Sequence, residues 1–153
     1  MTVLVALASE EDGEALAASL ESRGLRVLLA ASGEGALRAL KDAEDPGPRL
    51  AILDQDLPGL NGLRVLGRIR LETSLLGCEV LIAISARDFQ VKEAALKGGA
   101  LGVLVKPLSP VKMGKTVISL LAGKMPKSRE ILMDVRRAKL DMALDDLRWK
   151  IPK

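Results

Sequence analysis

The chain has 153 residues, of which 48% are hydrophobic and only 1% aromatic, and it carries a formal net charge of +3. This length suits one domain, whose core must be built from Leu, Val, Ile and Ala. The chain has no His, which excludes Ser-His and Cys-His nucleophiles and the commonest metal ligand. With Phe89 and Trp149 as its only aromatic residues, it lacks platforms for stacking nucleic-acid bases.

Cys78 is the single cysteine, so no intrachain disulfide can form, and its place at the start of an apolar run predicts a small buried residue. No apolar run approaches the roughly 18 residues that a membrane span needs. The first residues enter an apolar run directly, without a basic leader or a cleavage site. We therefore expect a cytoplasmic location.

The first half of the chain alternates strand-like and helix-like segments. Residues 3–8 form a continuous apolar run, which predicts a strand buried on both faces. A predicted helix at 10–22 is followed by Gly24, at the place where helices often end in a left-handed residue. A second strand at 26–30 and a second helix at 33–43 come next, before turn-forming residues at 44–48.

The second half repeats the alternation three more times. A third strand at 50–53 ends at Asp54, the fourth ends at Ser85 and the fifth is followed by Lys106. Ser109 and Pro110 suit the cap and first position of a last helix. The remaining segments are strands at 80–84 and 103–105 and helices at about 61–72, 89–97 and 110–123. The pattern predicts an α/β fold, a doubly wound five-stranded parallel sheet with helices on both faces.

Residues 124–153 form a basic C-terminal extension to the predicted domain at 1–123. The extension has nine Lys or Arg against five Asp or Glu, whereas the rest of the chain has fourteen against fifteen. A helix from Ser128 to about Trp149 would carry a broad apolar face. This helix can fold back onto its own domain, or it can serve a dimer or a partner, and the sequence favours neither.

Three polar residues at strand ends carry the candidate chemistry. In parallel sheets of this kind, ligands bind at the carboxyl ends of the strands. The Asp54 carboxylate can act as a nucleophile toward a phosphoryl donor, and Ser85 and Lys106 can hold phosphoryl oxygens. Phosphoryl transfer also needs a divalent cation, usually Mg²⁺ on oxygen ligands, and Asp54 and Asp56 are the acidic residues nearby.

These segments resemble the receiver domains of response regulators, which have a flavodoxin-like fold and act in two-component phosphorelays. The resemblance covers about residues 2–123. It rests on the segments Ile-Leu-Asp-Gln-Asp-Leu-Pro-Gly-Leu-Asn-Gly at 52–62, Ile-Ala-Ile-Ser-Ala-Arg at 82–87, and Gly-Gly-Ala at 98–100 leading to Val-Lys-Pro at 105–107.

The resemblance implies a role for each matching residue. Asp54 would accept a phosphoryl group from a sensor histidine kinase, Ser85 would hydrogen-bond the phosphoryl group, and Lys106 would pair with it. The backbone carbonyl of Asp56 would bind Mg²⁺ together with Asp54. The bond between Lys106 and Pro107 should be cis.

Two positions depart from the family pattern. The acidic pair that follows the first strand and binds Mg²⁺ is replaced by Leu7 and Ala8, and Glu10 and Glu11 would reach the site only through a reshaped loop. The aromatic switch residue of the fifth strand is replaced by Val103. Mg²⁺ binding should therefore be weak or absent, since hard cations need several oxygen ligands.

Two hypotheses for the function are compatible with this fold. We favour an atypical, non-enzymatic receiver that acts through protein-protein contacts with impaired Mg²⁺-dependent phosphorylation, and the alternative is a functional phospho-accepting regulator that uses Asp54. A homodimer through the fifth or the C-terminal helix is a further hypothesis, with Val103, Val111, Val117 and Ile118 lining or supporting the interface.

Functions of other classes are weaker fits. A hydrolase using Asp54 lacks a second acid or base, since Glu10 and Glu11 are the only candidates. Nucleic-acid binding would rest on the basic extension, but thirty residues hold no helix-turn-helix and acidic residues dilute its charge. We expect no membrane partner.

Overall fold

The structure is a computed structural model that describes residues 1–44, 47–75 and 77–123. The predicted C-terminal helix, with its basic residues, lies outside the described residues. Within them, one sheet has five strands in the order β2-β1-β3-β4-β5. The strands are β1 (Thr2–Ala6), β2 (Arg26–Ala30), β3 (Leu50–Asp54), β4 (Glu79–Ile84) and β5 (Gly102–Val105). All neighbouring strands pair in parallel.

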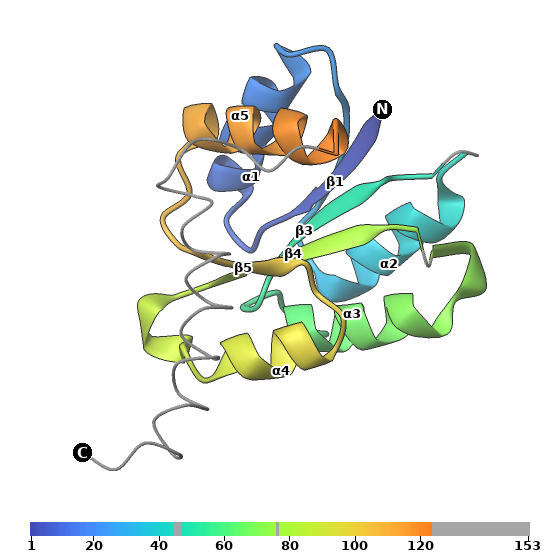
Figure 1. Cartoon of the computed structure of the whole chain (residues 1–153), viewed down its shortest axis with the longest axis vertical. Helices are drawn as coiled ribbons and strands as arrows, with labels where there is room; N and C mark the ends of the chain where they lie inside the picture. The colour runs from blue at the N-terminus through green and yellow to red at the C-terminus, as the bar shows by residue number, and fades with distance from the viewer. Residues whose placement is uncertain (45–46, 76, 124–153) are drawn as a thin grey trace.

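The helices lie in two layers, one on each face of the sheet (Figure 1). α1 and α5 cover one face and are packed against each other, while α2, α3 and α4 cover the other. Their bounds are α1 (Glu10–Glu21), α2 (Gly33–Asp42), α3 (Gly62–Leu71), α4 (Val91–Lys97) and α5 (Pro110–Leu121). This arrangement confirms the predicted doubly wound α/β fold.

The sheet separates two aliphatic cores, because side chains alternate between its faces. On the α1 and α5 side, Val5, Ile52 and Leu81 pack with Leu16 and Leu20 of α1. The other core places residues of the same strands against α2, α3 and α4. Every residue of β3 is buried. The central strands are therefore held on both faces, which fixes the position of their carboxyl ends.

Capping side chains set where several helices begin. Ser9 accepts a hydrogen bond from the backbone N–H of Asp12, and Ser32, Asn61 and Ser109 make the equivalent bond at α2, α3 and α5. Such caps satisfy N–H groups that have no partner within the helix. Gly24 has the left-handed φ of 86° expected after α1.

The structure corrects two predicted boundaries. β1 ends at Ala6, so Leu7 and Ala8 lie beyond the strand that was predicted to include them. α4 begins at Val91 rather than Phe89, and a 3-10 turn, Ala86–Asp88, precedes it. A second 3-10 turn, Thr73–Leu75, follows α3 and has no counterpart in the prediction. Within the described ranges, no helix is long and apolar enough to span a bilayer.

Candidate phosphoryl-acceptor site

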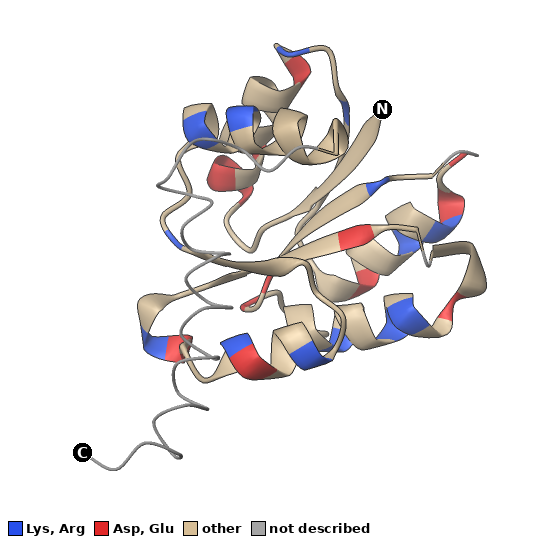
Figure 2. Cartoon of the chain, viewed as in Figure 1, with Lys and Arg blue, Asp and Glu red and all other residues tan. Residues whose placement is uncertain are grey.

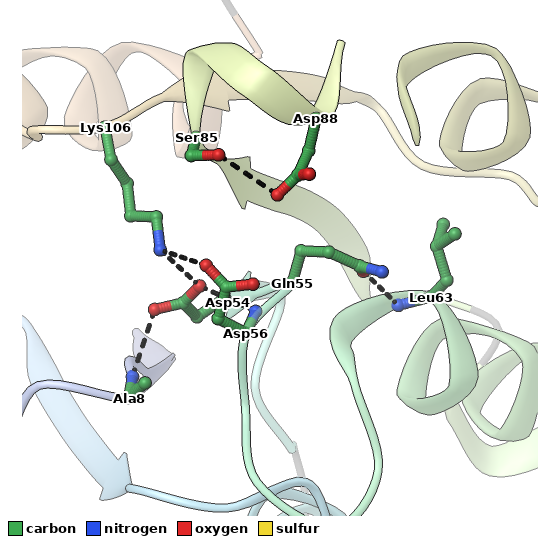
Figure 3. A network of polar contacts seen from close by, with 8 residues as sticks. All are labelled: Ala8, Asp54, Gln55, Asp56, Leu63, Ser85, Asp88 and Lys106. Atoms are coloured by element: carbon green, nitrogen blue, oxygen red, sulfur yellow. Dashed lines mark hydrogen bonds and ion pairs between the residues drawn. The ribbon is translucent and has the colours of Figure 1, made fainter. Parts of the chain in front are cut away.

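The structure brings two of the three predicted site residues into direct contact. Asp54 is the last residue of β3, Ser85 follows β4 and Lys106 follows β5 (Figure 3). Parallel strands bring these ends to one edge of the sheet. Lys106 reaches Asp54, whereas the Ser85 hydroxyl is turned toward Asp88 (Figure 3). The Lys106–Pro107 bond is cis, as predicted.

The Asp54 carboxylate is buried, with 3% of the residue exposed, and both of its oxygens accept hydrogen bonds. Oδ2 accepts from the backbone N–H of Ala8 at 3.1 Å. Oδ1 accepts from the backbone N–H of Asp56 at 2.9 Å and from Lys106 Nζ at 2.8 Å. These bonds offset the cost of burying a carboxylate and hold its orientation.

Lys106 bridges two carboxylates. Its Nζ lies 2.8 Å from Asp54 Oδ1 and 2.9 Å from Asp56 Oδ2. Partial burial lowers the pKa of the Lys106 ammonium, but hydrogen bonds to Asp54 and Asp56 outweigh burial and leave that pKa above its ordinary value of 10.5. Lys106 therefore stays charged at neutral pH and supplies positive charge where two negative groups converge.

Leu7 and Ala8, which replace the acidic pair, face different surroundings. The Leu7 side chain is 5% exposed and packs in the core beneath α1 and α5. Ala8 is exposed and contributes its backbone N–H to Asp54. Neither residue supplies an oxygen ligand from its side chain. Within residues 1–44, 47–75 and 77–123, no three His, Cys, Asp or Glu side chains are grouped so that they could hold a metal ion.

Asp12 is the acidic residue that lines the pocket beside Asp54, and sequence reasoning missed it. This pocket is lined by Asp12 of α1, by Asp54 and by Lys106, among apolar residues that include Leu7, Leu16 and Leu108. Glu10 instead lines a separate pocket beside β2, and Glu11 lines neither. No spacing in the sequence marks Asp12, which is exposed in the first turn of α1, three residues after the capping residue Ser9.

The loop after Asp54 is fixed by a side-chain hydrogen bond and by a close backbone approach. Gln55 Oε1 accepts from the N–H of Leu63 at 2.9 Å, which ties the loop to the first turn of α3 (Figure 3). A Cβ atom at Gly62 would lie 2.9 Å from the Asp54 carbonyl oxygen, so only glycine allows this close approach. The loop thereby keeps Asp56 within reach of Lys106.

The residues proposed for an interface divide into two groups. Val103 and Val117 are 1% and 0% exposed and belong to the cores, so they do not line a surface. Val111 and Ile118 are 61% and 37% exposed on α5. α5 carries basic residues and no acidic ones (Figure 2). This surface is therefore apolar and positively charged.

Fold and site together define a class of protein: a five-stranded doubly wound domain with an Asp–Lys pair at the carboxyl ends of its strands. Residues 9–118 match the model of the response regulator receiver domain. The chain belongs to this family, whose members are signalling domains of two-component systems.

Relatives and solved structures agree with this assignment. The chain is 38% identical over 111 residues to the nitrate/nitrite response regulator protein NarL of Escherichia coli, covering 72% of this chain and 49% of NarL. It is 40% identical over 93 residues to the transcriptional regulatory protein KdpE of Mycobacterium tuberculosis, covering 61% of this chain and 38% of KdpE. The chain thus spans about half or less of the length of these relatives.

A putative response regulator from Chloroflexus aurantiacus has a TM-score of 0.70 and 30% identity, covering 79% of this chain and 97% of that one. A CheY-like receiver domain protein from Methanospirillum hungatei has the same fold, with a TM-score of 0.70 at 20% identity, covering 80% of this chain and 94% of that one.

Proposed function

We propose that this receiver domain is atypical: it signals through protein-protein contacts, and its Mg²⁺-dependent phosphorylation at Asp54 is impaired. The observation that carries the proposal is the replacement of the metal-side carboxylates by Leu7 and Ala8, beside an Asp54 that already pairs with Lys106. In this role the domain is a non-catalytic module.

The donor set around Asp54 does not fit a Mg²⁺ ion. Mg²⁺ requires near-octahedral oxygen coordination, usually with one or two carboxylates. Asp54 Oδ1 already accepts two hydrogen bonds and Oδ2 one, while the carboxylate of Asp56 pairs with Lys106. Leu7 supplies an apolar wall of the adjoining pocket instead of a ligand. A metal ion would have to displace the Lys106 ammonium or compete with its charge.

The alternative, a functional phospho-acceptor, is supported by Asp12. This residue lines the same pocket as Asp54 and Lys106, so it offers one carboxylate on the side of the lost pair. In such a receiver, an Asp54 oxygen would attack the phosphorus of a phosphohistidine. The P–N bond would break, and the imidazole would leave with the bonding electrons and take up a proton.

Amide NMR of the full chain with Mg²⁺ and beryllofluoride, a phosphoryl-group analogue, separates the two functions. An impaired site gives no saturable shift at Asp54, Ser85 or Lys106 at millimolar Mg²⁺. Shifts that need both Mg²⁺ and the analogue would overturn the proposal. Repeating them with Asp12→Asn would then show whether Asp12 is the substitute ligand.

A matched control restores the missing carboxylates. Leu7→Asp with Ala8→Asp rebuilds the acidic pair in the same chain. If the proposal is right, this double variant gains the Mg²⁺-dependent shifts that the parent lacks, and Asp54→Asn in that background removes them. A restored pair that gains nothing would show that Leu7 and Ala8 are not what impairs the site.

We further propose that the partner is a sensor histidine kinase or another signalling protein, with a homodimer through α5 or the C-terminal extension as a second possibility. Exposed Val111 and Ile118 on the basic surface of α5 favour a contact there. Light-scattering mass of the full chain and of a variant ending at residue 123 tests the dimer. If the full chain and the shortened variant are both monomeric, the extension is not a dimerisation element. If the full chain is a dimer, the Val111→Glu variant should dissociate it.

A further inference from the structure

The Ser85 hydroxyl is held by Asp88. Ser85 Oγ donates to Asp88 Oδ2 at 3.0 Å, and within the described part of the chain this is the only acceptor that the hydroxyl reaches (Figure 3). A hydroxyl has a single proton to donate. While Asp88 accepts it, Ser85 has no proton to offer to an oxygen at Asp54.

The turn after β4 holds Asp88 in place independently of its side chain. The backbone N–H of Asp88 donates to the Ser85 carbonyl oxygen at 2.9 Å and closes the 3-10 turn Ala86–Asp88. Ser85 is the cap residue of this turn, but its side chain makes no capping bond to a backbone N–H. The hydroxyl donates its proton to the Asp88 carboxylate, a charged acceptor that makes a stronger hydrogen bond than a neutral one.

The same turn leads to a surface residue. Phe89 follows Asp88 directly, is 44% exposed, and has Lys92 Nζ 5.0 Å from its ring centroid. The backbone N–H of Lys92 donates to the Phe89 carbonyl oxygen at 3.2 Å, which connects the turn to α4. The 3-10 turn that carries Asp88 is thus followed directly by an exposed aromatic side chain just before α4.

We infer that Asp88 is a positioning residue that holds the Ser85 hydroxyl away from Asp54 and Lys106. The inference deepens the proposed function, since it adds a second reason why this site does not engage a phosphoryl group. With the hydroxyl released, Ser85 can rotate about χ1 and donate toward the oxygens that Lys106 now faces. The two arrangements differ by a side-chain rotation and the exchange of one hydrogen bond.

NMR of the metal-free full chain, with no phosphoryl donor present, tests this inference, so its outcome does not depend on whether Asp54 can be phosphorylated. The readouts are the Hα–Hβ couplings of Ser85, which report χ1, and the Nζ resonance of Lys106. The parent chain should show one χ1 rotamer. Asp88→Ala should give averaged couplings and a shifted Lys106 Nζ resonance, whereas Asp88→Asn, which keeps an oxygen acceptor, should resemble the parent.

A Ser85→Ala background separates positioning from a merely structural role. In this background Asp88→Ala should no longer move the Lys106 Nζ resonance, because the hydroxyl that transmits the change is gone. Unchanged Ser85 couplings in Asp88→Ala, or an equal Lys106 shift with and without Ser85, would overturn the inference. If Asp88→Ala does not fold, the Ser85→Ala variant replaces it as the test. Loss of the hydroxyl donor should then shift the Asp88 Cγ resonance. An unchanged Asp88 Cγ resonance would overturn the inference.

Discussion

Lys106 Nζ lies 2.8 Å from Oδ1 of Asp54, a carboxylate with only 4% of its side chain exposed, while 27% of the Lys106 side chain remains exposed. The pair joins the ends of β3 and β5, which are separated in the sheet by β4. Asp54 also receives two backbone N–H groups, so its charge is held by three donors. Removing any one donor leaves a buried negative charge less well compensated.

Replacing Lys106 by Met should lower the free energy of unfolding at pH 7 by about 1–3 kcal/mol, the range for leaving a buried hydrogen-bonding group without a partner. The partial exposure of Lys106 keeps the effect below that of a fully buried ion pair. Urea denaturation followed by circular dichroism measures it. Lys115→Met, at an exposed lysine of α5, is the control and should change stability little. Asp54→Asn combined with Lys106→Met should recover most of the lost unfolding free energy, because the buried charge is then removed. Equal losses in the single variants of Lys106 and Lys115 would contradict the argument.

Cys78 should make stability fall with rising pH above about pH 9. Burial raises the pKa of this thiol from 9.0 to about 11, with the nearby Arg70 charge opposing the shift. Because the unfolded thiol loses its proton first, stability is fully present below pH 9.0 and is lost as pH rises through the folded-state pKa near 11. A shift of this size corresponds to about 3 kcal/mol.

The measurement compares the parent chain with Cys78→Ala at several pH values from 8 to 11, using urea denaturation. The other ionisable groups are the same in both chains, so their contribution to the pH dependence cancels in the difference. The parent should lose more stability than the variant across this range, and the thiol should resist a disulfide reagent at pH 8 in the folded state. Parallel pH profiles would show that the Cys78 thiol is not desolvated.

Gly33 should tolerate no side chain, because α2 begins against the loop that carries the site. A Cβ atom at Gly33 would overlap the Leu60 carbonyl oxygen and lie 2.5 Å from Leu60 Cβ. The Gly33 N–H also donates to the Pro58 carbonyl oxygen at 3.2 Å, so the loop cannot move away without losing this bond. Gly33→Ala should cost about 1–3 kcal/mol of unfolding free energy, as overpacking usually does.

Gly67 provides the matched control for this substitution. It lies in α3, and a Cβ atom there would meet nothing within 4 Å. Gly67→Ala should therefore raise the unfolding free energy by about 0.5–1 kcal/mol through helix propensity alone. Thermal unfolding should show a lower midpoint for Gly33→Ala and a higher midpoint for Gly67→Ala than for the parent chain. Midpoints that change in the same direction would contradict the role of the contact with Leu60.

Much of the fold follows from local patterns, because each strand is a short apolar run and several helices start at a capping side chain. The strand-end positions of Asp54, Ser85 and Lys106 followed from the same pattern. The direction of the Ser85 hydroxyl did not, since it depends on a 3-10 turn that places Asp88 beside it. The place of Asp12 also escaped prediction, because the path from Ala6 to α1 is set by the cap at Ser9 and by tertiary packing.

The burial of Val103 and Val117 could not be predicted from the sequence pattern either. β5 is an edge strand and α5 carries exposed residues, and apolar character alone does not say whether a residue on these elements is buried. Only the packing of β5 and α5 against the sheet separates these two from the exposed Val111 and Ile118.

Restoring the acidic pair should make the stability of the domain depend on Mg²⁺. Leu7→Asp with Ala8→Asp places two carboxylates beside the buried Asp54, and it also removes the Leu7 side chain from the core. The new carboxylates and the Asp54 carboxylate repel one another, so the variant should be less stable than the parent in EDTA. A cation that binds only the folded state stabilises it by mass action, and the thermal midpoint of the variant should rise with Mg²⁺ concentration.

The parent chain, in which Leu7 offers no ligand, should have the same thermal midpoint in EDTA and in millimolar Mg²⁺. Leu7→Asn with Ala8→Asn is the control for the lost apolar packing, since it is polar but uncharged and should gain little from Mg²⁺. A parent midpoint that rises with Mg²⁺ to the same extent as that of the restored variant would mean that Asp54, Asp56 and Asp12 already suffice to bind the ion, and the impaired-site proposal would fall.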